Sequence, residues 1–154
     1  MSAGPVSQRL AELGIELPEV AAPVAAYVPA RQDGAQVRTS GQLPFVDGEL
    51  PVCGKVGGQV TAEQAQKLAR QCALNALAAA ADVVGLDNLA GVVHVTGFVA
   101  STTDFTGQPG VINGASELFG DIFGADGAHT RSAVGVPVLP LDSAVEVEVT
   151  FAVR

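Results

Sequence analysis

The residue types that most often carry catalysis are few in this sequence and form no familiar constellation. Cys53 and Cys72 are far apart, and no grouping of His and Cys completes a zinc site. Ser40 and Ser132 lack the nucleophile elbow and the partner order of a serine hydrolase. His94 stands alone in a valine-rich segment, where a packed residue is the ordinary interpretation. The pattern therefore favours neither a zinc enzyme nor a serine hydrolase.

Arg131 and Glu146 are the stronger candidates, because side-chain alternation along two predicted strands places them on one face of a sheet. Residues 144–153 alternate strictly between apolar positions and a second set that contains Glu146. The same parity, applied to residues 131–138, groups Arg131 with Ala133 on the face away from the helices and leaves Ser132, Val134, Val136 and Val138 to face the helices. A lone arginine there could hold a small anion, and the alternative is a salt bridge between subunits. This face carries small residues and a few charges, which is too polar for a core and too apolar for ordinary surface, so it also suggests oligomer assembly.

The segments around these candidates predict an α+β fold with the order β-β-α-β-α-β-β, a mainly antiparallel sheet and helices on one face. Asp33-Gly34 is a turn signal between two short runs, as in a hairpin. Strands are expected over residues 24–31, 36–43, 89–100, 131–138 and 144–153. Val93 and Val99 are expected to share one side of the middle strand. The segment 45–60, rich in Gly and Pro, indicates a surface loop.

Three helices are expected, two of them on one face of this sheet and one appended at the N-terminus. Thr61 and Gln64 form a capping box that begins a helix, and the helical spacing of apolar residues continues to Gly85. A second amphipathic helix is predicted over Pro109–Phe123. A short appended helix is predicted over residues 6–13, ahead of the domain proper.

Length and charge limit the class of protein. The 154 residues suit one domain, and the formal net charge of −8 would repel a phosphate backbone. Nucleic acid and anionic membrane surfaces are therefore poor candidate partners. The sequence has neither a signal-peptide pattern nor an apolar run of membrane-spanning length. We expect a cytoplasmic protein.

Two groups of short motifs connect the sequence to a known family. They are Thr39-Ser40-Gly41-Gln42-Leu43-Pro44, and Arg131-Ser132 followed by Leu139-Pro140 and Val145-Glu146-Val147-Glu148. On these motifs the sequence resembles the YjgF/RidA family, the reactive intermediate deaminases. The resemblance covers residues 24–154 and leaves residues 1–23 as an N-terminal extension. It implies a chorismate-mutase-like subunit, three of which close a β-barrel with helices outside and a cleft at each subunit boundary.

The resemblance also implies an activity. Family members are hydrolases that convert reactive 2-imino acids, such as 2-iminopropanoate and 2-iminobutanoate, to 2-oxo acids and ammonia without a metal or organic cofactor. The expected ligand is thus a small carboxylate or imino acid at the interfaces of a homotrimer. The alternative from another class is a non-catalytic trimer that binds small carboxylates, or a partner protein, as a sensor.

Carried over residue by residue, the resemblance gives Arg131 the substrate carboxylate, a task that suits a planar fork of parallel donors. Glu146 matches the acid that positions the attacking water, and Gly41 matches a backbone contact to the substrate. His129 is a candidate for the cleft mouth, whereas Glu148 is interpreted as structural. Further matching pocket positions are Ser40, Tyr27, Asn113 and Ala133, the last of which is cysteine in many relatives.

Overall fold

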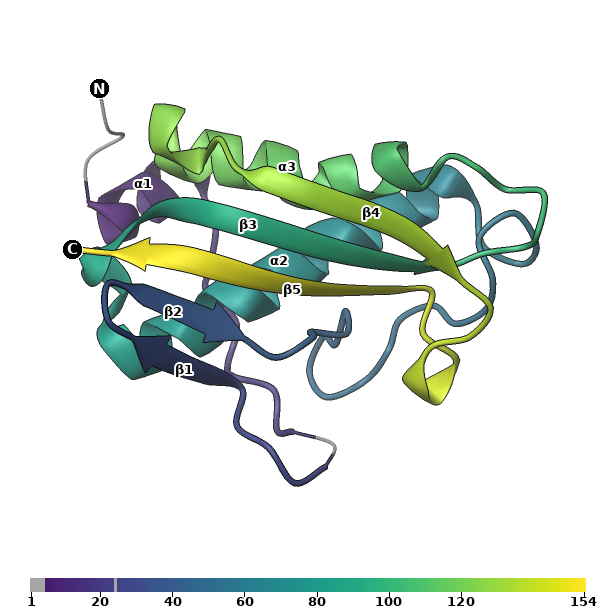
Figure 1. The fold of residues 1–154 in the computed structure, drawn as a ribbon, viewed down its shortest axis with the longest axis horizontal. Helices are drawn as coiled ribbons and strands as arrows, with labels where there is room; N and C mark the ends of the chain where they lie inside the picture. Colours follow the sequence, from purple (N-terminus) through teal and green to yellow (C-terminus); the bar gives the residue numbers. More distant parts are fainter. Residues whose placement is uncertain (1–4, 24) are drawn as a thin grey trace.

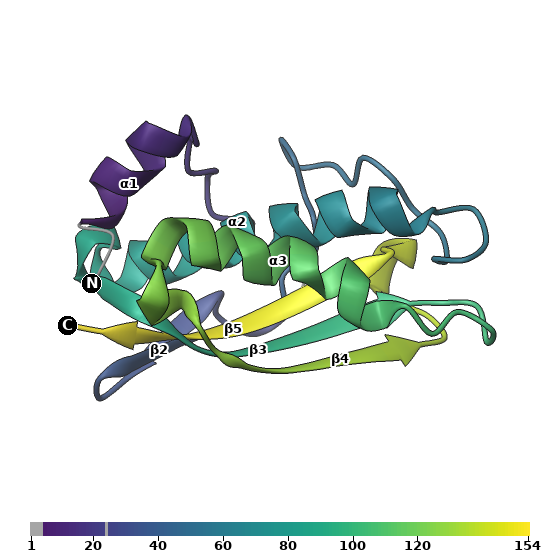
Figure 2. The ribbon, with the colours of Figure 1, turned by 90° about the horizontal axis from the view of Figure 1, so that it is seen from above.

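A five-stranded sheet carries helices on one of its two faces and leaves the other face open (Figures 1 and 2). The computed structural model describes residues 5–23 and 25–154. The elements, in chain order, are α1 Val6–Leu13, β1 Ala30–Asp33, β2 Gln36–Thr39, α2 Ala62–Val84, β3 Leu89–Ala100, α3 Gln108–Phe123, β4 Thr130–Val136 and β5 Val145–Val153. This confirms the predicted α+β fold and its element order.

The strand order is β1-β2-β5-β3-β4, so β1 and β4 form the two edges of the sheet. Every neighbouring pair is antiparallel except β3 and β4, which are parallel. The parallel pair follows from the connection, because α3 carries the chain back along the sheet before β4 begins. The predicted hairpin forms around Gly34, although β1 begins only at Ala30; Val24, its predicted start, lies outside the described residues.

Helix α2 begins and ends where the sequence indicates. The Thr61 side chain accepts a hydrogen bond from the Gln64 backbone, and the Gln64 side chain accepts one from the Thr61 backbone. Gly85 ends the helix. Its buried face is mainly alanine, which lets α3 approach closely. At the contact, a Cβ on Gly114 would lie 2.0 Å from the Gln66 carbonyl oxygen, so the two helices touch through backbone.

Helix α1 is anchored to the body of the subunit at both its apolar face and its first turn. Val6 and Leu10 are buried in the common core. Pro5 supplies no side-chain cap, and the Asp87 carboxylate accepts bonds from the Ser7 backbone and hydroxyl at 2.8 and 2.7 Å. These bonds hold the pKa of Asp87 below its usual value. The helix is therefore part of the packed fold, and a domain boundary at residue 23 stays a prediction.

Strand β4 has the opposite parity to the one predicted. Arg131 pairs with Val95, which pairs in turn with Val149, and both valines are buried under the helices. Residues opposite one another in neighbouring strands share a face, so Arg131 faces the helical side, as does Ala133 two positions later. The prediction that Arg131 shares the open face with Glu146 was therefore wrong.

The error arose because β4 is an edge strand. Ser132, Val134 and Val136, which we expected to face the helices, lie on the open face, where Val134 is 45% exposed. Val138 lies beyond the end of the strand and is 66% exposed. Alternating valines indicate a face that will be covered, but among the described residues of one subunit this face stays open at Val134.

One further side-chain position departs from the prediction. The pairing of β3 with β5 shifts register between Val92 and His94, as at a β-bulge. Val92 is buried, whereas Val93, expected on the same side as Val99, is 36% exposed.

Within the described residues, no helix is long and apolar enough to cross a membrane.

Candidate functional site

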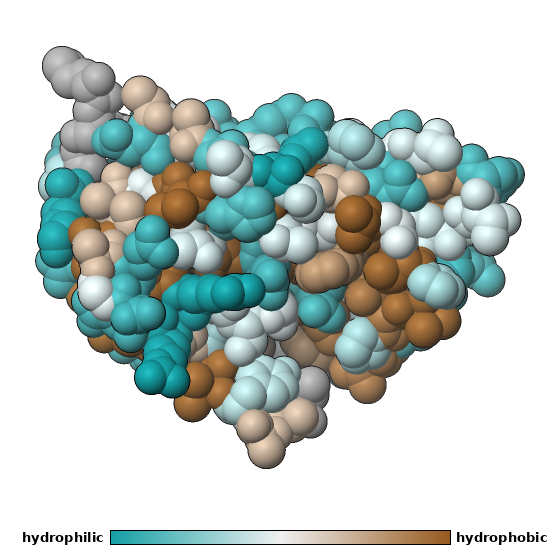
Figure 3. Space-filling view, in the orientation of Figure 1, coloured by the Kyte–Doolittle hydropathy of each residue, from teal (hydrophilic) through white to brown (hydrophobic). Residues whose placement is uncertain are grey.

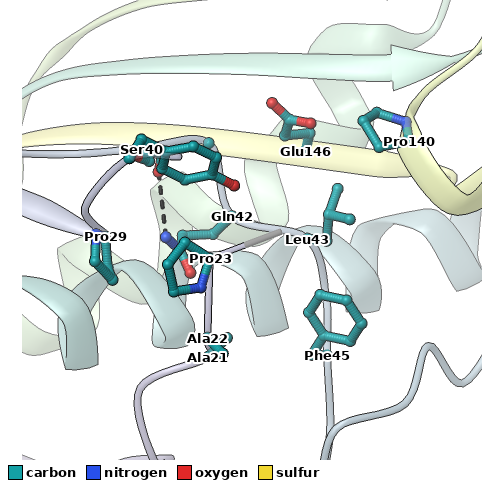
Figure 4. A pocket seen from close by; sticks show the side chains of 12 residues that line it. Ala21, Ala22, Pro23, Pro29, Ser40, Gln42, Leu43, Phe45, Pro140 and Glu146 are labelled. Atoms are coloured by element: carbon teal, nitrogen blue, oxygen red, sulfur yellow. Dashed lines mark hydrogen bonds between the residues drawn. The ribbon is translucent and has the colours of Figure 1, made fainter. Parts of the chain in front are cut away.

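A cavity of about 410 Å³ opens beside Glu146, where the chain leaves β2 (Figure 4). Tyr27, Ser40 and Gly41 line it together with Glu146. The structure therefore brings these four predicted site residues together from the first hairpin region and from β5. Glu146 projects from the open face of the sheet, because Val145 and Val147 on either side of it are buried.

The carboxylate of Glu146 occupies space that a side chain on Gly41 would take. A Cβ added to Gly41 would lie 2.1 Å from Glu146 Oε2. Burial, with a smaller contribution from the neighbouring Glu148 charge, raises the pKa of Glu146 above its usual value. A carboxyl group with a raised pKa takes up and returns a proton closer to neutral pH than an exposed one, which suits acid-base chemistry.

The segment that carries Gly41 is tied down on both sides. The Ser40 hydroxyl donates to the Val28 carbonyl at 2.6 Å, and the Ser40 backbone donates to Pro29 at 2.8 Å. Gln42 exchanges two backbone hydrogen bonds with Val147 on β5 at 2.8 and 3.0 Å. Ser40 thus helps to fix the loop. The backbone around Gly41 is held against β5 before any ligand binds.

Arg131 lies in a different hollow, between β4 and α3, where neutral oxygen atoms surround its guanidinium. Nη1 donates to Asn113 Oδ1 at 2.8 Å and to Ser116 Oγ at 3.1 Å, and Nη2 donates to the Pro109 carbonyl at 3.2 Å. The ion pairs found among residues 5–23 and 25–154 do not include Arg131. Its charge is therefore positioned by neutral groups and is not neutralised by an acid in the described part of the subunit.

His129 extends this arrangement by one further residue. Its Nδ1 lies 2.7 Å from the Gly127 carbonyl, which can only accept, so Nδ1 carries the proton. In the tautomer with the proton on Nδ1, Nε2 accepts from the Ser116 hydroxyl, 2.9 Å away. The Ser116 oxygen remains available to accept from Arg131. We expected His129 near the cleft mouth; it lines the Arg131 hollow.

Sequence reasoning missed Ser116. The signal available was its spacing, because Ser116 lies three residues after Asn113 and so falls on the same face of the predicted helix. Ala133, the remaining predicted position, follows Arg131 along the helical side of β4 and pairs with Gly97 of β3. A backbone contact from Ala133 would not require a thiol at this position.

Within one subunit the predicted site is therefore divided in two. Arg131, Asn113 and Ala133 belong to the α3–β4 edge, whereas Tyr27 and Glu146 belong to the cavity beyond β2. Arg131 and Glu146 also lie on opposite faces of the sheet. Hydrogen bonds within the subunit hold the residues of each half in place, so the separation of the two halves is a property of the single-chain fold.

An α+β subunit of this topology, with an arginine on its edge strand and an acid on its open face, is of the chorismate-mutase-like class. The family model described as "YjgF/chorismate_mutase-like, putative endoribonuclease" matches residues 7–153. The chain belongs to this YjgF family. The match includes most of α1, which the sequence motifs had left outside the resemblance.

Similar proteins agree with this assignment. Protein TCP17 of Trypanosoma cruzi is 41% identical over 150 residues, covering 96% of this chain and 94% of that protein. The crystal structure called a putative endoribonuclease from Shewanella oneidensis is 32% identical, with a TM-score of 0.92 over 97% of this chain and 100% of that one. The structure of Escherichia coli TdcF with bound serine is 27% identical, with a TM-score of 0.65 over 90% and 96% of the two chains.

Proposed function

We propose that this chain hydrolyses reactive 2-imino acids to 2-oxo acids and ammonia, at sites formed between the subunits of a homotrimer. The observation that carries the proposal is the state of Arg131. Three neutral oxygens hold its guanidinium in place, and no acid within the described residues pairs with it. A positioned cation without an ionic partner suits the capture of a small carboxylate.

In the proposed reaction, Arg131 binds the carboxylate and Glu146 directs a water molecule to the imine carbon. Glu146 accepts a proton as the water oxygen bonds to that carbon and returns it to the nitrogen. Glu146 then passes the hydroxyl proton to the nitrogen, the carbon–nitrogen bond breaks, ammonia leaves, and the carbonyl of the 2-oxo acid forms. The overall change consumes one water molecule and needs no oxidant or reductant.

The open face of the sheet supports the assembly. Apolar surface gathers over the end of β4 and the turn that follows it (Figure 3), where Val134, Val138 and Leu141 are 45%, 66% and 61% exposed. Apolar side chains concentrated at a strand edge favour contact with another copy of the chain. Such contact would bring Arg131 of one subunit toward the Glu146 cavity of its neighbour, which joins the two halves of the site.

Two other functions compete with this one. A non-catalytic trimer that binds small carboxylates is favoured by the serine bound to TdcF, because serine is a small amino acid with a carboxylate. Ribonuclease activity is suggested by the names of relatives, but a net charge of −8 opposes binding to a phosphate backbone. A measurement of imine hydrolysis distinguishes the non-catalytic trimer from the proposed enzyme.

The test is the loss of 2-iminopropanoate, which an amino-acid oxidase generates from alanine and semicarbazide traps. Arg131→Ala should lower kcat/KM by roughly 100-fold, since hydrogen bonds between charged groups contribute about 1.5–3 kcal/mol each. The matched control is Arg70→Ala, which removes the same charge from an exposed position on α2 and should leave turnover unchanged. Near-normal turnover by Arg131→Ala contradicts the mechanism. Binding of pyruvate without any imine loss favours the sensor.

A further inference from the structure

The cavity beside Glu146 extends well beyond the polar groups that the reaction uses. Its far wall is apolar and is formed by Phe45 and by the linker residues Ala21, Ala22 and Pro23, whereas Pro140 lies at the Glu146 end and Leu43 lies between the two ends. Figure 4 shows Glu146 at one end and Phe45 with the two alanines at the other. The space thus runs from a carboxylate to a hydrocarbon surface.

The linker wall is a built part of the fold. It follows α1, whose Val6 and Leu10 are buried in the core and whose first turn is bonded to Asp87. The linker then runs toward β1 (Figure 1), and its residues Ala21, Ala22 and Pro23 line the cavity. Because Ala21 and Ala22 have short side chains, the linker closes one side of the cavity without filling it.

The volume exceeds what the smallest imino acids need. At the ~30 Å³ that a water molecule occupies in the liquid, the six heavy atoms of 2-iminopropanoate would take roughly 180 Å³. The cavity in one subunit measures about 410 Å³. A methyl side chain would leave the apolar wall uncovered, whereas a longer hydrocarbon side chain would reach it and be removed from water.

We propose that the preferred substrates are 2-imino acids with branched or long apolar side chains, such as the imine derived from leucine, and that the linker wall at residues 21–23 selects them. This inference rests on the proposed function, because Glu146 is taken to lie beside the reacting carbon. It concerns the other end of the same cavity, which is composed of residues of a single subunit.

The first part of the test compares imines generated from alanine and from leucine with the wild-type protein. One methylene in an apolar pocket changes kcat/KM by roughly 10- to 200-fold. The leucine-derived imine, with three more carbons, should therefore be preferred by about tenfold or more. Equal kcat/KM values, or a preference for the alanine-derived imine, would overturn the inference.

The second part fills the cavity. Ala22→Phe should lower kcat/KM for the leucine-derived imine by about tenfold and for the alanine-derived imine by less than about threefold. Ala22 is exposed, so the variant is expected to fold, which its melting temperature checks. The control is Ala11→Phe, the same change at an exposed position of α1 outside the cavity lining. Equal losses for both imines in Ala22→Phe would contradict selection by the linker.

The outcomes separate this inference from the proposed function. If folded wild-type protein hydrolyses neither imine, the proposed function fails and the selectivity falls with it. If it hydrolyses the alanine-derived imine without preference, only the selectivity is wrong.

Discussion

The substitution Gly41→Ala tests whether the position of the Glu146 carboxylate matters to the reaction. The added Cβ would lie 2.1 Å from Oε2 and 2.8 Å from Cδ of Glu146. An ordinary van der Waals contact begins near 3.4 Å. The carboxylate must therefore withdraw by about 1.3 Å, a displacement comparable to the 1 Å errors that cost roughly 100-fold in rate.

The same geometry predicts a small effect on stability. The atoms that collide with the new methyl group belong to the end of a flexible side chain, and Gly41 does not have the positive φ that disfavours alanine. Moving Glu146 away from its preferred rotamer costs about 0.5–1.5 kcal/mol. For a domain of this size, that corresponds to a change in melting temperature of only a few degrees.

The assay is imine loss with 2-iminopropanoate, together with thermal unfolding of the same samples. Gly110→Ala is the matched control, because Gly110 lines neither the cavity nor the Arg131 hollow, a Cβ there meets nothing within 4 Å, and alanine favours the helix by up to about 1 kcal/mol. We expect this control to be fully active and Gly41→Ala to lose about 100-fold in kcat. If Gly41→Ala turns over imine at the wild-type rate, the assignment of Glu146 as the water-directing group is refuted.

Two further predictions concern the two halves of the site. Ser116→Ala removes one acceptor from Arg131 and should raise KM by roughly five- to tenfold with little change in kcat, as expected for about 1 kcal/mol from one hydrogen bond; an unchanged KM would mean that Ser116 does not position the arginine. Glu146→Gln tests the raised pKa of Glu146. Because the pKa is higher in the folded state than the ordinary 4.5, ionisation of Glu146 lowers the stability of the folded state as the pH rises from 4.5 through the folded-state pKa. Urea denaturation should therefore show Glu146→Gln to be at least as stable as wild type at pH 7, with any advantage disappearing in acid. A less stable variant at neutral pH would contradict the direction of the shift.

Local sequence signals predicted the helices and the last strand correctly. The reciprocal bonds of Thr61 and Gln64 and the stop at Gly85 form within a few residues of one another, so their geometry depends little on the rest of the chain. The alternation of β5 was equally reliable, because that strand lies inside the sheet with one face under the helices. The spacing of the motifs around Gly41, Arg131 and Glu146 likewise indicated the family.

Only the tertiary structure determined which face of the sheet each β4 side chain occupies. Alternation assigns residues to two faces but does not say which face the helices cover, and an exchange of faces moves every side chain. Val134 resembles a core residue because a sequence does not distinguish burial within a subunit from an apolar surface open to a partner. Arg131 consequently faces α3 and donates to Ser116, a contact that depends on which face of β4 the helix covers.

The cavity illustrates the same limit. The individual types of Glu146, Gly41 and Tyr27 are visible in the sequence, and the motif around Gly41 indicated their shared role. Their meeting with linker residues 21–23 required α1 to pack on the core and the chain to return past β2. Chemistry that resides in a side chain can be read from its residue type, whereas the volume and walls of a cavity arise only when segments distant in sequence are packed together.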